Sequence, residues 1–306
     1  MSLALLCSGQ GQQGPEMLDL VAAVPAARHV LDSASLCLGA DPVDLCRSAP
    51  ELVLQANREG QVLCVTRALA VAAAVFPTGA PSDTLLAGYS VGEMAAWGVA
   101  GVWPAEETLM LAGRRAQAMD AASGPDDGLG YVRGLSRPAV ERLAARFGCA
   151  LAIANPGLLF IVGGDRVSIE ALCVAALEDG AMRAAPMRVR VASHTPRLAP
   201  AVAPFFEALT TTSPRPPRLR LVSATGPALI ADPSHALSGL ARQLAEPIDW
   251  TGVLETLAER GVTQVLELGP GHALAEMAAA ALPQATARAV DDFRSIEGIK
   301  RWLGTQ

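Results

Sequence analysis

Lysine is almost absent from this sequence. Lys300 is the only lysine, so nearly all of the 24 Lys and Arg residues are arginine. A Walker A phosphate loop and a pyridoxal Schiff base both require a lysine at a defined position. The sequence offers no such lysine for either chemistry.

Charge, aromatic residues and long apolar runs are also scarce. Charged residues make up 18% of the chain, aromatics 4%, and the formal net charge is −6. An acidic chain without a basic run is a poor partner for nucleic acid. The apolar stretch in residues 1–7 is too short to span a membrane and lacks the basic residues of a signal peptide. We therefore expect a cytoplasmic protein with neither nucleic-acid nor membrane partners, and a buried strand at residues 3–7.

The cysteines show no metal-binding or redox spacing. All six are scattered, without a CxxC pair. This usage is typical of buried free thiols in a cytosolic protein. We predict no metal site.

Alternating apolar strands and amphipathic helices predict an α/β fold. The chain has 306 residues, of which 51% are hydrophobic. This is enough to form the core of one large domain, or of a large domain with a smaller insertion. Helices are expected at residues 26–38, 61–75, 91–99 and 105–119, and strands at 3–7, 84–88, 219–223 and 264–268. We expect an α/β-hydrolase-like catalytic domain with a parallel sheet, formed by residues 1–121 and 191–306.

A loop signal at residues 122–128, rich in Gly, Pro and Asp, marks a change of pattern. The segments that follow are expected to be strands at 129–133, 149–153, 158–162 and 182–189, with helices at 137–147 and 167–179. This βαββαβ order is the ferredoxin-like split motif. Residues 122–190 are therefore predicted to form a small inserted domain.

Gly88-Tyr89-Ser90-Val91-Gly92 fits the pattern G-x-S-x-G. An apolar strand precedes it and a helix follows, and this sharp turn is tolerated only between glycines. The turn would raise the Ser90 hydroxyl above the sheet, beside the positive end of the helix. The context predicts Ser90 as a nucleophile.

A nucleophilic serine needs a base, and the chain has four histidines. His194 follows the last strand of the predicted insertion and is the favoured base. His29 and His235 are expected on surface helices, whereas His272, at another helix start, could line a pocket or cap the helix. The residues alone leave this choice open.

Arg115 lies on the helix predicted at 105–119. Most helical arginines are solvated, so this is the ordinary expectation. A guanidinium is nevertheless the natural reader of a substrate carboxylate, because it can bind both oxygens at once.

Five motifs, taken in order, resemble the malonyl-CoA:acyl-carrier-protein transacylase family over nearly the whole chain. They are Gly9-Gln10-Gly11-Gln12-Gln13, Gly88-Tyr89-Ser90-Val91-Gly92-Glu93, Arg115-Ala116-Gln117-Ala118-Met119, Ser193-His194 and Leu266-Glu267-Leu268-Gly269-Pro270-Gly271.

The resemblance implies a role for each matching residue. Ser90 resembles the family nucleophile and His194 its base, while the main-chain N–H groups of Gln10 and Val91 look like the oxyanion hole. Arg115 matches the arginine that binds the malonyl carboxylate, and Gln243 matches the residue whose carbonyl orients the histidine. It also implies malonyl-CoA as donor, an acyl carrier protein as partner, and no permanently bound cofactor.

Three departures separate this chain from the usual pattern. Tyr89 replaces a histidine, the segment around Asn155 is shortened, and Arg115 is followed by Ala116 instead of glycine, which leaves Arg114 as an alternative register. Together with the tail at residues 291–295 and 302–303, they resemble the malonyl transferase (epsilon) subunit of malonate decarboxylase. That branch implies a carrier subunit with a phosphoribosyl-dephospho-CoA arm, and other decarboxylase subunits as partners. The alternative is the fatty-acid-synthesis enzyme, whose carrier has a phosphopantetheine arm.

The same residues allow three other interpretations. Residues 9–14 also fit G-x-G-x-x-G, but a dinucleotide site needs a helix opening at the last glycine and an acid at a strand end. Asp32, at the right distance, lies instead in a helical pattern.

An esterase or thioesterase would share the serine turn, but no acid is clearly placed between Ser90 and His194 to complete a triad. A non-catalytic scaffold is disfavoured by the presence of the serine, histidine and arginine together.

Overall fold

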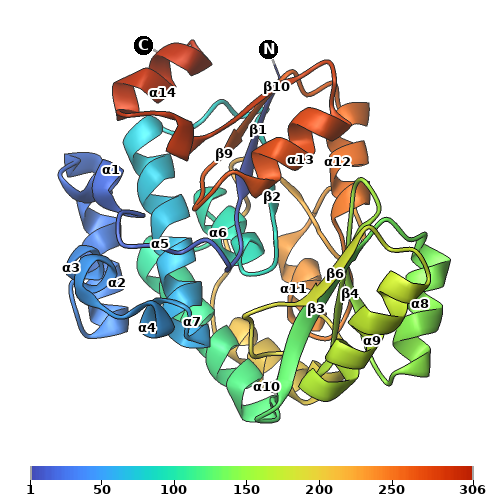
Figure 1. Ribbon diagram of the computed structural model, residues 1–306. Coiled ribbons are helices and arrows are strands. Elements are labelled where there is room, and N and C mark those ends of the chain that lie inside the picture. The colour runs from blue at the N-terminus through green and yellow to red at the C-terminus, as the bar shows by residue number, and fades with distance from the viewer. Residues whose placement is uncertain (1, 305–306) are drawn as a thin grey trace.

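The apolar N-terminal strand lies at the centre of a five-stranded parallel sheet (Figure 1). The computed structural model describes residues 2–304. The strand order is β10-β9-β1-β2-β7, and every neighbouring pair is parallel. The bounds are β1 Leu3–Cys7, β2 Leu85–Gly88, β7 Arg220–Val222, β9 Gln264–Glu267 and β10 Thr286–Ala289. All five residues of β1 are buried, which explains its continuous apolar sequence.

Helices cover both faces of this sheet, and two separate apolar clusters fill the space between. One face is covered by α5 and α6, the other by α12 and α13 (Figure 1). The helices outside the second sheet are α1 Asp19–Ala22, η1 Pro25–Ala27, α2 Arg28–Leu38, α3 Pro42–Ser48, α4 Glu51–Leu54, α5 Asn57–Val75, α6 Gly92–Val99, α7 Ala105–Ala122, η2 Pro196–Leu198, α10 Ala199–Thr210, α11 Pro233–Arg242, α12 Trp250–Glu259, α13 Ala273–Ala281, η3 Val290–Asp292 and α14 Ile296–Leu303.

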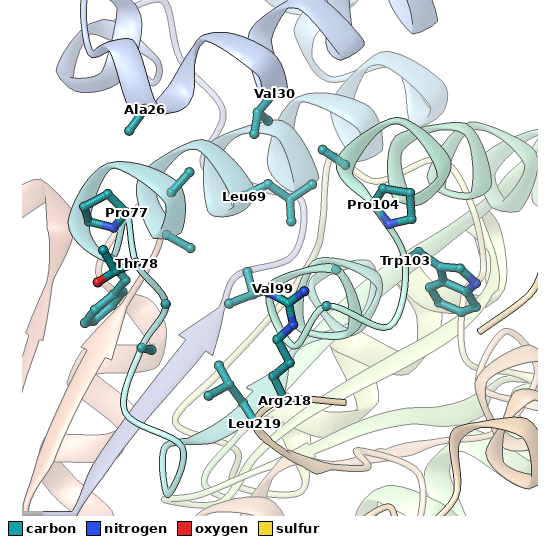
Figure 2. Close-up of a pocket in the computed structure, with 18 of the residues that line it drawn as sticks. Ala26, Val30, Leu69, Pro77, Thr78, Val99, Trp103, Pro104, Arg218 and Leu219 are labelled. Carbon is teal, nitrogen blue, oxygen red and sulfur yellow. The ribbon is translucent and has the colours of Figure 1, made fainter. Parts of the chain in front are cut away.

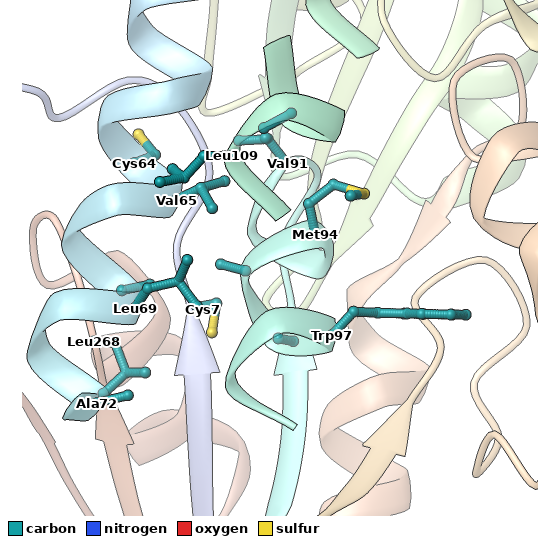
Figure 3. Packing of buried hydrophobic residues seen from close by; sticks show 14 of the residues in the cluster. Cys7, Cys64, Val65, Leu69, Ala72, Val91, Met94, Trp97, Leu109 and Leu268 are labelled. Carbon is teal, nitrogen blue, oxygen red and sulfur yellow. The ribbon is translucent and has the colours of Figure 1, made fainter. Parts of the chain in front are cut away.

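Helix α5 is buried along almost its whole length, because other helices surround it. Figure 3 shows the result: Val65 and Leu69 of α5 lie toward Cys7 of β1, and toward Val91 and Met94 at the start of α6. This packing fixes α6 against the end of β1. The helix that follows Ser90 therefore has little freedom to move.

A second sheet has the order β6-β3-β5-β4-β8. Its elements are β3 Asp127–Arg133, α8 Arg137–Arg146, β4 Ala150–Asn155, β5 Leu159–Asp165, α9 Arg166–Glu178, β6 Arg183–Pro186 and β8 Ile248–Asp249. Strand β3 pairs antiparallel with β5 and β6, and β4 pairs antiparallel with β5. The predicted strand–helix–strand–strand–helix–strand order matches the observed order of β3 to β6. Helices α8 and α9 lie on the outer face of this sheet (Figure 1).

Two details of this layer differ from expectation. Strand β8 comes from outside residues 122–190 and pairs in parallel with β4, so the sheet is not built from the predicted insertion alone. A two-residue strand has no detectable sequence period, which is why it was missed. The strand expected at 182–189 is also shorter, spanning Arg183–Pro186, although the Met187 N–H still donates to the Leu129 carbonyl of β3 at 2.7 Å.

The close approach of α6 to β1 gives a stability prediction. A side chain at Gly92 would overlap the main-chain carbonyl of Cys7, whereas a methyl group at Gly14 would meet nothing within 4 Å. We expect Gly92→Ala to lower the free energy of unfolding by about 3 kcal/mol or more. Gly14→Ala, the matched control, should change it by less than about 0.5 kcal/mol. Urea unfolding measures both, and equal stability of the two variants would contradict the packing described.

Candidate active site

Ser90 lies in a tight turn between the end of β2 and the start of α6. Its φ angle is 57°, a left-handed conformation that residues with side chains seldom adopt. The flanking glycines are required by contact, since a Cβ at Gly88 would overlap the main chain of Gly92, and one at Gly92 would overlap Cys7. The turn closes with a hydrogen bond from the Gly92 N–H to the Tyr89 carbonyl at 3.0 Å. The local geometry is that of a strand–turn–helix elbow.

His194 is the histidine that reaches Ser90. Its Nε2 lies 2.8 Å from the Ser90 Oγ, and its Nδ1 lies 2.7 Å from the main-chain carbonyl of Gln243. Because a carbonyl can only accept, Nδ1 must hold the proton and Nε2 is left as the acceptor for the Ser90 hydroxyl. Its main-chain N–H donates to the Leu244 carbonyl at 2.8 Å, which holds the backbone at a φ of 63°.

The surroundings of His194 keep it neutral. The side chain is buried, and burial lowers its pKa to about 3, with a smaller contribution from the nearby Arg115 cation. A neutral imidazole is the form that can accept a proton.

The other three histidines lie elsewhere. His29 is exposed on α2. His235 pairs with Asp232 at the surface, and His272 pairs with Asp292. The surface positions expected for His29 and His235 are confirmed.

Gln10 and Val91 lie on the two segments that meet at Ser90. A Cβ at Gly9 would stand 2.7 Å from the Tyr89 carbonyl and 3.4 Å from the Ser90 Cβ, so the loop after β1 lies directly against the elbow. Within residues 2–304, neither the Gln10 nor the Val91 main-chain N–H donates a hydrogen bond. Both donors remain available to a ligand.

Arg115 is not solvated, contrary to the ordinary expectation for a helical arginine. It is 1% exposed, whereas Arg114 is on the exposed side of α7 and contacts Gln117. The Arg115 guanidinium donates to the Gln61 Oε1 at 2.7 Å and to the Gln243 Oε1 at 3.3 Å. Burial lowers its pKa to about 10, which still leaves it charged near neutral pH. The burial of Arg115 therefore favours the alignment in which Arg115, and not Arg114, matches the carboxylate-binding arginine of the family.

Two residues of this cluster were missed as site residues, namely Gln61 and Glu93. Glu93 is 2% exposed and accepts a short hydrogen bond from the Gln243 side-chain amide. Burial raises its pKa to about 7, while the Arg115 charge acts in the opposite direction. The signal for Glu93 was its place three residues after Ser90, in the first turn of α6. Gln61 lies on α5 among both polar and apolar residues and gave no comparable signal.

Tyr89 and Asn155 border the elbow on the side of the second sheet. The Tyr89 ring packs edge-on against Trp250, with centroids 5.3 Å apart, and its pKa is raised by burial. Asn155, at the end of β4, is 4% exposed and its Oδ1 has no hydrogen-bond partner.

The dinucleotide reading does not fit the structure. No helix opens at Gly14, since α1 begins at Asp19. Asp32 lies in α2, where it pairs with Arg28 at the surface. The loop of residues 9–14 therefore lacks the helix N-terminus that would hold a pyrophosphate.

A pocket of about 780 Å³ lies at the opposite end of α6, between Val99, Trp103 and Arg218 (Figure 2). None of the candidate site residues lines it. In residues 2–304 no group of three or more His, Cys, Asp or Glu side chains could hold a metal ion. Among these residues, no helix combines the length and apolar character needed to cross a bilayer.

Several known proteins resemble this chain over nearly its whole length. The malonyl CoA-acyl carrier protein transacylase of Haemophilus influenzae is 27% identical over 310 residues, covering 98% of each chain. The crystal structure of acyl-carrier-protein S-malonyltransferase from Burkholderia pseudomallei has a TM-score of 0.92 at 30% identity, covering 98% of this chain and 100% of that one. A malonyl-transacylase in complex with its type II PKS acyl-carrier protein has a TM-score of 0.92 at 27% identity, with both chains fully covered.

The model of the acyl transferase domain family matches residues 4–292, which include every candidate site residue described above. The chain belongs to the acyl transferase domain family.

Proposed function

We propose that this chain moves a malonyl group from malonyl-CoA to the thiol of an acyl carrier protein, through an ester on Ser90. The observation that supports it most is a buried, charged Arg115 joined through one glutamine to the Ser90–His194 hydrogen bond. The relatives' names describe this same transfer.

Ser90 and His194 act as a dyad in the proposed reaction. His194 Nε2 takes the Ser90 proton as Oγ attacks the thioester carbonyl carbon. The N–H groups of Gln10 and Val91 stabilise the resulting oxyanion, a contact worth about 2.7–4 kcal/mol per donor. The carbon–sulfur bond then breaks, and the CoA sulfur leaves with the proton from His194. A carrier thiol reverses these steps and releases Ser90.

Arg115 selects the acyl group. A guanidinium binds the two oxygens of a free carboxylate, and its Nε has no hydrogen-bond partner in the structure. A neutral acyl group would leave this buried Nε–H without an acceptor, which costs binding energy. We therefore expect malonyl to be preferred over acetyl.

For the acceptor, we propose the carrier subunit of malonate decarboxylase, with its phosphoribosyl-dephospho-CoA arm. Tyr89 beside the nucleophile supports this branch. The tail gives weaker support, because Asp291 and Phe293 make contacts inside the chain, with Arg67 and Trp302. The alternative is a fatty-acid-synthesis carrier with a phosphopantetheine arm, which agrees with the relatives' names.

The proposed architecture is an α/β-hydrolase-like domain, residues 1–121 and 191–306, with a ferredoxin-like domain at 122–190. The order β6-β3-β5-β4 of the second sheet supports the latter. A cytoplasmic location and association with other decarboxylase subunits are part of the same proposal. No bound cofactor is required.

The Ser90 ester can be tested by intact mass after mixing with malonyl-CoA. The wild type should gain one malonyl group, Ser90→Ala none, and Ser82→Ala, an exposed serine before β2, should gain it as the wild type does. A carrier thiol should remove the group. Faster discharge by the phosphoribosyl-dephospho-CoA carrier would support the decarboxylase setting, and discharge by water alone would instead indicate a thioesterase.

Arg115→Ala should lower kcat/KM for malonyl transfer by at least about 100-fold, while acetyl transfer holds or rises. Arg114→Ala is the matched control, since its side chain is exposed one position away, and it should stay within about twofold. Steady-state kinetics with both acyl-CoA donors measures this. The reverse pattern in the two variants would move the carboxylate site to Arg114.

We expect the fall in Ser90 reactivity at acid pH to occur at a much lower pH than for an ordinary histidine base. His194 must be neutral to accept a proton, and its pKa is lowered to about 3, so the base is lost only as the pH falls through that value. The rate of inactivation by an uncharged serine-directed fluorophosphonate should therefore show no histidine step between pH 8 and pH 5. Because the pKa of the nearby Glu93 is about 7, only a step near pH 6.5 that persists in Glu93→Gln would contradict the buried, neutral His194.

A further inference from the structure

Glu93 is a buried acid for which the proposed reaction has no step. It lies in the first turn of α6 and accepts hydrogen bonds from the Gln243 side-chain amide and from the Ala224 main-chain N–H at 3.3 Å, and the Trp97 side chain, one turn along α6, also favours its ionised form. Both bonds go to the same atom, Oε2. Oε1 can therefore take up a proton without disturbing either bond.

The Gln243 side chain joins this acid to Arg115. Arg115 has only donors, so the Gln243 Oε1 must face it and the amide nitrogen must face Glu93. The Gln243 main-chain carbonyl meanwhile holds His194. The acid and the carboxylate-reading cation are thus separated by one amide group.

When Glu93 is ionised, the charges of this cluster cancel in the absence of an acyl group. Arg115, from α7, is the charged group that acts on Glu93, and His194, on the other side of Gln243, is neutral. A bound malonyl carboxylate would bring a second negative charge into the same buried space. Two anions close together in low dielectric disfavour one another, and one of them gains a proton.

Resting on the proposed function, we propose that Glu93 is the counter-ion of Arg115 in the empty enzyme, and that binding of a carboxylate-bearing acyl group draws one proton from solvent onto Glu93. The malonyl carboxylate, paired directly with Arg115, stays ionised. Glu93 is one amide farther away and becomes a neutral acid. Glu93 is accordingly a positioning and charge-balancing residue.

The ionisation of Glu93 agrees with this role. Burial raises its pKa to about 7, so the free enzyme exchanges this proton near neutral pH. Carboxylate binding favours the protonated form, so malonyl affinity is greatest below pH 7 and falls as the pH rises above it. The fall is about tenfold per pH unit while one proton is coupled to binding.

The test measures protons taken up on binding to Ser90→Ala protein, which binds without transfer. Calorimetric titration in two buffers of different ionisation enthalpy gives the number of protons. Acetyl-CoA is the matched control, because its CoA portion is identical. At pH 8 the uptake with malonyl-CoA should exceed that with acetyl-CoA by about one proton, and at pH 6 this difference should shrink.

The double variant Ser90→Ala/Glu93→Gln imitates the neutral acid. It should show no extra uptake with malonyl-CoA, and its affinity should not fall between pH 7 and pH 9. A purely structural role for Glu93 predicts instead weaker binding at every pH. An uptake that survives Glu93→Gln, or no malonyl–acetyl difference in the Ser90→Ala parent, overturns the inference. The second criterion applies even if the double variant does not fold.

The inference and the proposed function fail differently. If wild-type protein forms no malonyl ester on Ser90, both are wrong. If the ester forms and the proton difference is absent, the transfer stands and the role of Glu93 is wrong.

Discussion

Gln243 directly follows α11 and lies inside the site, and the positions of three other side chains depend on it. Its main-chain carbonyl sets the tautomer of His194, and its side-chain amide lies between Arg115 and Glu93. These bonds hold only if the end of α11 stays in place. Buried Leu240 and the Leu244 that follows secure it in the core. Apolar packing thus determines polar geometry several residues away, as expected in a close-packed interior.

Ser90 and His194 are both held in unfavourable backbone conformations. Among residues 2–304, only Ser90, Leu158 and His194 have a positive φ without being glycine. Such conformations cost about 1–3 kcal/mol each and persist where surrounding contacts enforce them. For Ser90 the enforcing contacts are the glycine-packed turn, and for His194 the bond to the Leu244 carbonyl. Strain in two segments far apart in the sequence thus accompanies the contact between the Ser90 hydroxyl and the His194 imidazole.

The sequence predicted the parts of the site that depend on local pattern. Ser90 was identifiable because a strand, two glycines and a helix occupy adjacent positions. Arg115 was ambiguous, because burial of a helical arginine depends on Gln61 and Gln243, 54 and 128 residues away. Glu93 was not identifiable as its indirect partner for the same reason. Likewise, β8 joined the second sheet through pairing with β4, which no local period encodes.

Under the proposed function, a main-chain carbonyl as the hydrogen-bond acceptor for His194 Nδ1 suits a site that binds an anionic acyl group. A carboxylate beside His194 would place a negative charge near the substrate carboxylate and oppose its binding. The Gln243 carbonyl orients the imidazole without that charge. As His194 takes the Ser90 proton it becomes a cation near Arg115, which is unfavourable in a buried site. Under the proposed function, the malonyl carboxylate pairs directly with Arg115, one amide closer than Glu93, so His194 gains its proton beside a cation that is already paired. The acyl group then assists its own transfer, and selectivity extends from binding to the chemical step.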